Sequence, residues 1–350
     1  MSRQLLARAR AGDGDAFGEL VEPFRHELLV HCYRILGSAA DAEDALQETL
    51  VGAWRGLSRF EERSSLRSWL YRIATNKCLN ALRAGKSRFS HSPTPQSPPS
   101  APSAPSVELP APSAQGEPVW LDPYPDDLLG LVPGEVPDEA PGPEARYEAR
   151  ESVSLAFMTA LQHLPPTQRA ALILRDVLGF RAAEAADILD CSVDTINGLV
   201  RRARASIARQ VPPGSRDQAP LPGSARERDI ASRFADAYER GDVDTIIGLL
   251  TEDAKLTMPP LPFEYHGRES VAGFLAAVHP TAPYRLIPTR ANGQPAFGCY
   301  LPDSAAPVVR ANGLLVLTLD GDRISALTRF LDNSVIGRFG LPRTLPDKPD

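Results

Sequence analysis

The chain has 350 residues, of which 43% are hydrophobic and 23% charged, and its formal net charge is −6 at pH 7. This length predicts two or three domains, and the composition is typical of a soluble globular protein. No apolar run approaches the roughly 18 residues of a membrane span, and the first residues lack the apolar core of a signal peptide, so we expect a cytoplasmic protein. The four cysteines lie far apart, without a C-x-x-C pair. This spacing argues against a zinc site or a disulfide framework, and we expect no metal or other cofactor.

The acidic charge is concentrated in one segment. Residues 91–150 hold 10 acidic and 2 basic side chains, whereas residues 1–90 hold 11 acidic and 14 basic ones. The same segment contains the run HSPTPQSPPSAPSAPSVELPAPS, in which proline removes backbone donors and prevents regular structure. We therefore predict a linker over 91–144 and a shorter one over 212–225. Apolar residues in WLDPYPDDLLGLV indicate that this part of the first linker docks on a folded surface.

Residues 1–90 are predicted to be helical. In DAEDALQETLVGAWRGL, apolar residues that include Trp54 recur at steps of three and one, which indicates a helix with one buried face, and Ser38 is a suitable N-cap. The stretch SLRSWLYRIATNKCLNALR predicts a second helix with an apolar side and a basic side. Aromatic residues among cations suit single-stranded DNA, whose bases stack on rings while its phosphates pair with cations. Alternatively the aromatic residues belong to the core, which we favour for Trp69.

Residues 145–211 predict a small helical bundle. RAAEAADIL, the turn DCS and SVDTINGLVRRARASIARQ form two helices joined by a three-residue turn, the pattern of a helix-turn-helix. Ser192 is the predicted N-cap of the second helix, whose apolar residues face the bundle. Its other positions carry four arginines within nine residues, which suits the major groove of DNA. The alternative is an ordinary solvated helix face.

Residues 226–340 predict a domain of mixed type. RERDIASRFADAYERGDVDTIIGLL indicates two helices separated by Gly241, and the later segments alternate as strands. LVLTLDGDRISAL indicates a β-hairpin, because two apolar runs flank Asp-Gly-Asp. Helices followed by a meander of strands suggest an α+β domain.

Two of these blocks resemble a known family. GSAADAEDALQETLVGAWRGLSRFEERSSLRSWLYRIATNKCLNALR is similar to region 2 of the extracytoplasmic-function sigma factors, members of the sigma-70 family of bacterial RNA polymerase. ALQHLPPTQRAALILRDVLGFRAAEAADILDCSVDTINGLVRRARA is similar to their region 4. The resemblance covers nearly all of both blocks, in the family's order. It implies an alternative sigma factor, rather than an enzyme, that binds core RNA polymerase, recognises the −35 and −10 promoter elements and initiates transcription.

The resemblance also implies roles for individual residues. Region 2 of the family binds the clamp helices of the largest polymerase subunit and melts the −10 element, and region 4 binds the −35 element and the polymerase flap. The implied polymerase-binding residues are Asp41, Asp44, Gln47, Glu48 and Arg55. The implied −10-binding residues are Arg63, Ser64, Ser65, Arg67, Arg72, Asn76, Lys77, Asn80 and Arg83. The implied −35-binding residues are Thr195, Asn197, Gly198, Arg201, Arg202 and Arg204.

Gly198 departs from the residue expected at its position in the recognition helix. Glycine weakens a helix by up to about 1 kcal/mol relative to alanine, but it lets the backbone approach DNA closely.

The C-terminal block resembles the SnoaL-like domains of the nuclear-transport-factor-2-like superfamily. The resemblance rests on RERDIASRFADAYERGDVDTIIGLLTEDAKLTMPP, on YHGRESVAGFL and on the strands that follow. It implies a cone-shaped fold around a pocket, for which the candidate residues are Asp253, Tyr265, His266 and Asn292.

We favour a catalytically silent domain that regulates the sigma factor in cis, with a small molecule or a protein as its regulator. One alternative is a SnoaL-like enzyme tethered to a DNA-binding module, because one fold supports many functions. The other is a helix-turn-helix repressor that never touches polymerase, against which the acidic helix over 41–55 argues.

The predicted fold is thus multidomain. Two all-α domains, over 1–90 and 145–211, are joined by a proline-rich linker, and an α+β cone-shaped domain follows over 226–340.

Overall fold

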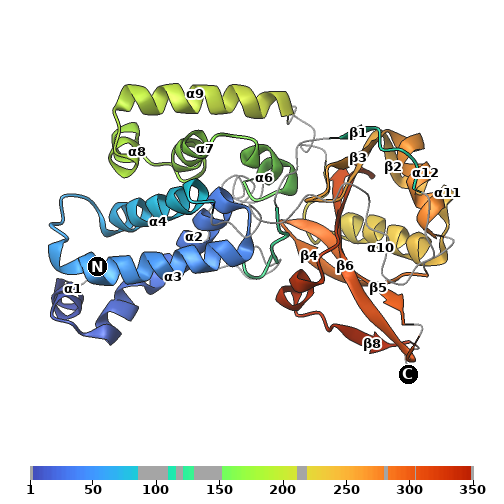
Figure 1. Ribbon diagram of the computed structural model, residues 1–350, viewed down its shortest axis with the longest axis horizontal. Coiled ribbons are helices and arrows are strands. Elements are labelled where there is room, and N and C mark those ends of the chain that lie inside the picture. Colours follow the sequence, from blue (N-terminus) through green and yellow to red (C-terminus); the bar gives the residue numbers. More distant parts are fainter. Residues whose placement is uncertain are drawn as a thin grey trace. The chain divides into compact units, whose positions relative to one another are not determined.

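The computed structural model describes residues 3–85, 109–115, 121–129, 152–210, 219–279, 283–303 and 305–347. The chain divides into two compact units (Figure 1). Unit 1 comprises residues 1–92 and 147–211, and unit 2 comprises residues 93–146 and 212–350. Trp120 and the predicted boundaries near 91, 144 and 211 lie outside the described residues. Within the described ranges, no helix combines the length and the apolar character needed to cross a bilayer.

The described residues in the first part of unit 1 form four helices. A 3₁₀ turn over Leu57–Arg59 lies between the third and the fourth. The helices are α1 (Arg3–Arg10), α2 (Gly14–Leu36), α3 (Ala39–Gly56) and α4 (Leu66–Arg83). Helices α3 and α4 occupy the two stretches predicted to be helical. Ser38 and Ser65 cap them, each accepting a hydrogen bond from the backbone N–H three residues further on. These bonds satisfy donors that the first turn of a helix leaves unpaired.

The apolar face predicted for α3 is buried except at Leu50, which is half-buried, and at Trp54. Ala42, Leu46 and Ala53 are buried, but Trp54 is 37% exposed and packs edge-on against Phe17. The helical period places position 54 at the margin of the buried stripe, where a large ring reaches solvent.

The second part of unit 1 contains the helix-turn-helix. Its helices are α6 (Leu155–Gln162), α7 (Pro166–Leu172), α8 (Ala182–Leu189) and α9 (Val193–Gln210). A π-helical turn over Ile173–Val177 extends α7. The turn between α8 and α9 is made by Asp190 in the left-handed conformation, with φ of 52°, and by Ser192, whose Oγ accepts from the Thr195 N–H at 3.1 Å.

The two parts of unit 1 pack on each other, with α4 against α8 and α2 against α6 and α7. Two buried arginines bridge them. Arg34 donates from Nε to the Ser152 carbonyl at 3.2 Å and from Nη2 to the Ser152 hydroxyl at 2.6 Å. Arg169 donates to the carbonyl of Ile35. Burial lowers the pKa of Arg34 and of Arg169 to about 10, so both remain charged at neutral pH.

The described residues of unit 2 form an eight-stranded sheet with three helices. The helices are α10 (Ala225–Arg240), α11 (Val243–Leu249) and α12 (Arg268–Val278). The strands are β1 (Ala114–Gln115), β2 (Leu250–Thr257), β3 (Phe263–His266), β4 (Arg285–Ala291), β5 (Gln294–Pro302), β6 (Val308–Asp320), β7 (Arg323–Phe330) and β8 (Thr344–Pro346). A 3₁₀ turn over Asn333–Phe339 lies between β7 and β8.

The strands are ordered β1-β3-β2-β7-β6-β5-β4, and β8 pairs with β6. Only β2 and β7 pair in parallel among these described strands. The predicted hairpin is present, because Asp320 pairs with Arg323 across a two-residue turn. Gly241, in the left-handed conformation, separates α10 from α11 as predicted.

The core of unit 2 lies between the helices and the sheet. Helix α10 packs on β4 and β5, and α12 packs on β2 and β3. Phe234 of α10 and Phe297 of β5 are buried there, with ring centroids 6.2 Å apart. This arrangement is the α+β domain that the sequence predicts.

Two pieces of the predicted linker belong to unit 2. Strand β1 adds to the edge of β3, and the Tyr265 hydroxyl donates to the carbonyl of Pro110 at 3.0 Å. Residues 121–129, which we call the strap, run beside the β4–β5 turn, where Pro125 bridges to Ala291. Leu121, Tyr124 and Leu129 of the strap are buried. The apolar part of the linker therefore docks on the C-terminal domain of its own chain.

Candidate nucleic-acid interface

Helix α9 presents a row of polar and basic side chains to solvent. Ile196, Val200 and Ala203 are buried against the bundle, as the spacing predicts. The outward residues of the predicted −35 set are exposed, except Gly198, which is half-buried; the exposed ones are Thr195, Asn197, Arg201, Arg202 and Arg204. The structure therefore brings all six predicted residues together on one side of one helix.

The arginines of α9 differ in how they are held. Arg204 makes a two-point ion pair with Asp176, at 2.8 Å from Nε and 2.7 Å from Nη2. Within the described residues, Arg201 and Arg202 form no such pair. A hollow of about 380 Å³ is lined by Arg175, Asn197, Val200, Arg201 and Arg204. Guanidinium groups that have no ion pair in the described structure and lie beside a hollow on an exposed helix suit phosphate oxygens or base edges.

The predicted −10 residues follow the exposed edge of α4 and the loop before it. Arg72, Asn76, Asn80 and Arg83 are exposed on α4. Lys77 is half-buried, and its ammonium group lies 3.2 Å from Glu48 of α3. In the preceding loop, Arg63 is exposed and pairs with Glu61, while the Ser65 hydroxyl accepts the capping hydrogen bond of α4. Ser64, half-buried, lies between them.

Arg67, from the same predicted set, is occupied inside unit 1. Its guanidinium donates to both carboxylate oxygens of Glu27, at 3.1 and 3.2 Å. The guanidinium carbon lies 4.9 Å from the ring centre of Tyr71 and 4.7 Å from that of Phe180, which precedes α8. The two rings meet edge to face at 5.1 Å. Arg67 thus links the region-2 helices to the helix-turn-helix.

The predicted polymerase-binding residues lie along α3. Asp44, Gln47, Glu48 and Arg55 are exposed, and Asp41 is half-buried. Two apolar side chains beside them, whose exposure was not predicted, also reach solvent. Val51 is 48% exposed and Trp54 is 37% exposed. Large apolar side chains that are exposed together among polar ones are typical of a protein-binding surface. Their positions along the helix could have indicated that they are exposed, whereas their apolar character could not.

The four candidate pocket residues of unit 2 do not converge. Asp253 is exposed on β2, and His266 is exposed on β3, where its Nε2 lies 2.6 Å from Glu264. Tyr265 points to the opposite face, because neighbouring residues of a strand alternate. Asn292 is buried in the β4–β5 turn, and its Oδ1 accepts from the Tyr124 N–H at 2.8 Å.

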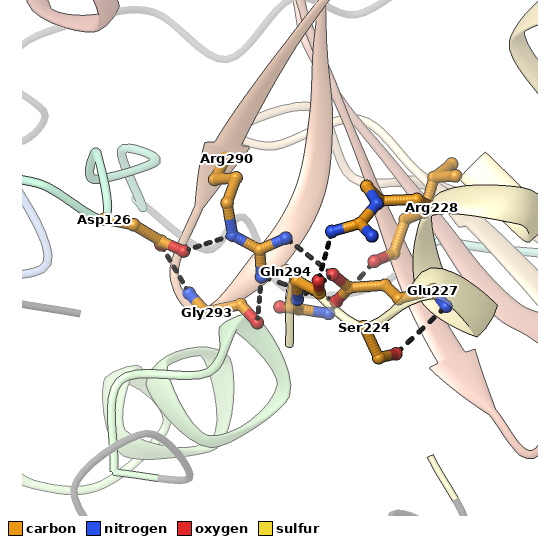
Figure 2. A network of polar contacts seen from close by, with 9 residues as sticks. Asp126, Ser224, Glu227, Arg228, Arg290, Gly293 and Gln294 are labelled. Atoms are coloured by element: carbon orange, nitrogen blue, oxygen red, sulfur yellow. Dashed lines mark hydrogen bonds and ion pairs between the residues drawn. The ribbon is translucent and has the colours of Figure 1, made fainter. Parts of the chain in front are cut away.

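A buried charge network, which was not predicted from the sequence, holds the strap on unit 2 (Figure 2). Arg290 donates from Nε to Asp126 at 2.9 Å and from Nη1 to Glu227 at 2.7 Å. Asp126 also accepts from the Gly293 N–H at 2.7 Å. Burial raises the pKa of Asp126, although the bonds from Gly293 and Arg290 oppose this. Its partners lie far away in the sequence, so no local pattern could reveal the network.

Comparisons with known proteins match both units. A model of sigma-70 region 2 matches residues 20–88, a model of sigma-70 region 4 matches residues 154–207, and a model of the SnoaL-like domain matches residues 231–326. The exposed recognition helix and the basic α4, carried by these two regions in this order, define a sigma-70-type transcription initiation factor.

Individual proteins similar to this chain indicate which group of sigma factors it belongs to. ECF RNA polymerase sigma factor SigG of Mycobacterium tuberculosis is 41% identical over 345 residues, which cover 97% of this chain and 86% of the relative. SigM of the same species is 31% identical over 208 residues, or 59% of this chain and 82% of the relative. The crystal structure of the M. tuberculosis sigma factor SigJ superposes with a TM-score of 0.59 at 21% identity, covering 93% of this chain and 99% of that one, which shows a shared fold.

The chain therefore belongs to the ECF sigma factors of RNA polymerase, with a SnoaL-like domain at its C-terminal side. It is an alternative sigma factor for promoter recognition and transcription initiation. As in its family, its partners are core RNA polymerase and promoter DNA.

Proposed function

We propose that α9 reads the −35 element and that α4, with the loop before it, melts and binds the −10 element. In this proposal α3 docks on the polymerase clamp helices, region 4 also contacts the flap, and the protein acts in the cytoplasm. The observation that carries the proposal is the exposure of Arg201 and Arg202, two cations without a partner in the described structure. Guanidinium groups in this state are ready to bind phosphates or guanine edges.

Arg67 and Arg72 add a conformational step to this proposal. Arg67 stacks on Phe180, and Arg72 lies 3.8 Å from Asp187 of α8. These arginines can reach the −10 strand only after they leave Phe180 and Asp187. In our proposal, contacts to DNA replace these two contacts. Phe180→Ala removes the stacking partner and should strengthen promoter opening, measured by permanganate reactivity of unpaired thymines. Trp54→Ala, in the same unit but away from this contact, serves as the comparison and should weaken polymerase binding instead.

Unit 2, in our proposal, modulates the sigma factor in cis without catalysing a reaction. The support is the strap: a segment between regions 2 and 4 is held on unit 2 by a buried charge network. The enzyme alternative requires an acid–base pair such as Asp253 with His266, and in the structure His266 pairs with Glu264.

Reconstituted transcription with core RNA polymerase tests both halves of the proposal. The full chain and a form ending near residue 215 are compared on a promoter library over a range of protein concentrations. We expect both to initiate and to differ in promoter strength or selectivity. Equal initiation at every concentration would refute regulation in cis, and failure of both forms to initiate with any promoter would refute the promoter-reading roles.

A further inference from the structure

Unit 2 contains a buried arginine whose charge has no counterpart in the described structure. Arg329, on β7, is 6% exposed. Its guanidinium donates to the carbonyl of Phe330 at 3.2 Å, to the Asn312 carbonyl and to Asn312 Oδ1 at 2.8 Å. No carboxylate among the described residues pairs with it, whereas Arg290 has two such partners. A buried cation requires an anion or a set of hydrogen bonds nearby, because desolvation of an uncompensated charge is costly.

The groups around Arg329 are uncharged. Burial raises the pKa of Tyr238, of Tyr284 and of the Cys299 thiol, so none of them supplies an anion at neutral pH. Burial also lowers the pKa of His279, which is therefore neutral there. Among the described residues, none of these neighbours therefore balances the positive charge of Arg329.

The same groups form one polar and aromatic cluster. The Arg329 guanidinium carbon lies 5.9 Å from the ring centre of Tyr284, which in turn lies 5.4 Å from that of Tyr238. The His279 ring meets Tyr238 edge to face at 4.3 Å. His279 is 8% exposed, and its Nε2 has no hydrogen-bond partner in the described structure. Residues from α10, from β7, from the C-cap of α12 and from just before β4 thus bring a ring nitrogen without a described partner and a buried cation into one cluster.

The Arg329 guanidinium also has an N–H group without a hydrogen-bond partner among the described residues. A guanidinium carries five N–H groups, and the described partners of Arg329 are the carbonyls of Phe330 and Asn312, the Asn312 side chain and the Tyr284 hydroxyl. Tyr284 stands before β4 and is half-buried, so the cluster is open to the surface at this ring. A planar fork of donors matches the two oxygens of a carboxylate.

We propose that Arg329, Tyr284 and His279 form a binding site for a small carboxylate with an apolar body. The Arg329 guanidinium binds the carboxylate, the Tyr284 hydroxyl donates to one of its oxygens, and the rings of Tyr238 and His279 pack on the apolar body. A purely structural arginine is the competing explanation, because Arg329 also fills the bend at Gly313. There, a Cβ would lie 2.0 Å from the Phe330 carbonyl oxygen.

Side-chain NMR of the full chain separates the two explanations. The Nε–Hε signal of Arg329, assigned through its loss in Arg329→Lys, is followed during titration with acetate and benzoate. Benzamide at the same concentration and sodium chloride at the same ionic strength are the controls. A carboxylate site gives a saturable shift with either carboxylate and none with benzamide. Absence of a saturable shift with both carboxylates overturns the proposal.

Variants then locate the site. We expect Arg329→Met to weaken benzoate binding about tenfold or more, and Tyr284→Phe to weaken it several-fold, since each loses a hydrogen bond to a charged group. The control is Arg233→Met, which removes an exposed arginine of the same unit. Equal affinity in Tyr284→Phe and in the unaltered protein overturns the assignment, even if Arg329→Met fails to fold. No polymerase enters these measurements, so their outcome is independent of the promoter-reading roles.

Discussion

The two units use arginine in opposite ways. In unit 1, Arg201 and Arg202 stand in solvent without an ion pair in the described structure, although they lie on a well-packed helix. In unit 2, Arg290 is largely buried and binds two carboxylates that are themselves 4% and 5% exposed. Cations held in water bind anions that come from outside, whereas cations held in the interior fix the position of chain segments. The same residue type therefore indicates recognition on the exposed face of α9 and attachment at the strap, as it does at the buried Arg34 and Arg169 of unit 1.

The largest predicted effect is the loss of stability when the buried, doubly paired Arg290 is replaced, because its environment differs most from that of the exposed arginines of α9. Arg290→Met leaves Asp126 and Glu227 buried without their cation, which should cost about 3–5 kcal/mol of the stability of unit 2 and release the strap. Amide hydrogen exchange of β5 measures this. Arg233→Met removes an exposed arginine from an i,i+4 pair and should change stability by less than about 1 kcal/mol. If the two variants behaved alike, the network would not hold the strap.

Within α9, a smaller effect should separate free from paired arginines. Arg201→Ala should weaken promoter binding by the holoenzyme by about 1–3 kcal/mol, because a free guanidinium gives its whole contact to DNA. Arg204→Ala should cost less, since Arg204 must first leave Asp176. Filter binding at fixed salt compares the two. A larger loss for Arg204→Ala would reverse our assignment of which arginine meets DNA.

The pH dependence of unit 1 should reflect a buried base. His31 Nε2 lies 2.9 Å from Thr75 Oγ1, and burial lowers the pKa of His31 from its usual 6.5 to about 3. Between these values the unfolded chain binds a proton that the folded chain does not, so stability falls as the pH falls.

From about pH 7.5 to about pH 5.5, this should remove about 1 kcal/mol from the unfolding free energy of unit 1. Denaturation followed by the fluorescence of Trp54 and Trp69 measures it. His31→Gln keeps a donor near Thr75 and should abolish this part of the slope. An unchanged slope in that variant would assign the effect to other groups.

The smallest effect concerns Gly198. Its backbone is helical, and an added Cβ would meet only the Arg202 guanidinium, at 3.5 Å. The fold itself thus gives no reason for glycine, and Gly198→Ala should stabilise region 4 by about 0.5–1 kcal/mol. We expect promoter binding to weaken at the same time, because the methyl group obstructs close approach to DNA. Stronger binding would show that the backbone does not approach the groove at this point.

Local patterns in the sequence were sufficient for the helices. Ser38 and Ser192 cap the helices that follow them, because a cap depends on residues three positions apart. The hairpin at Asp320 and the helix break at Gly241 were predicted for the same reason. The strap contact was not, since Arg290 and Asp126 are separated by 164 positions. The candidate pocket failed because strand alternation sends Tyr265 and His266 to opposite faces.

The strap also determines how far region 4 can travel. Leu129 of the strap and Ala219 both belong to unit 2, and region 4 lies between them in the chain. An extended chain spans at most about 3.6 Å per residue, so residues 130–151 allow roughly 80 Å and residues 211–218 roughly 30 Å. Region 4 is therefore part of a loop whose two ends are fixed to the same body. If α9 binds DNA as we propose, the shorter of these two spans limits how far unit 2 can lie from the promoter, and so sets its local concentration there.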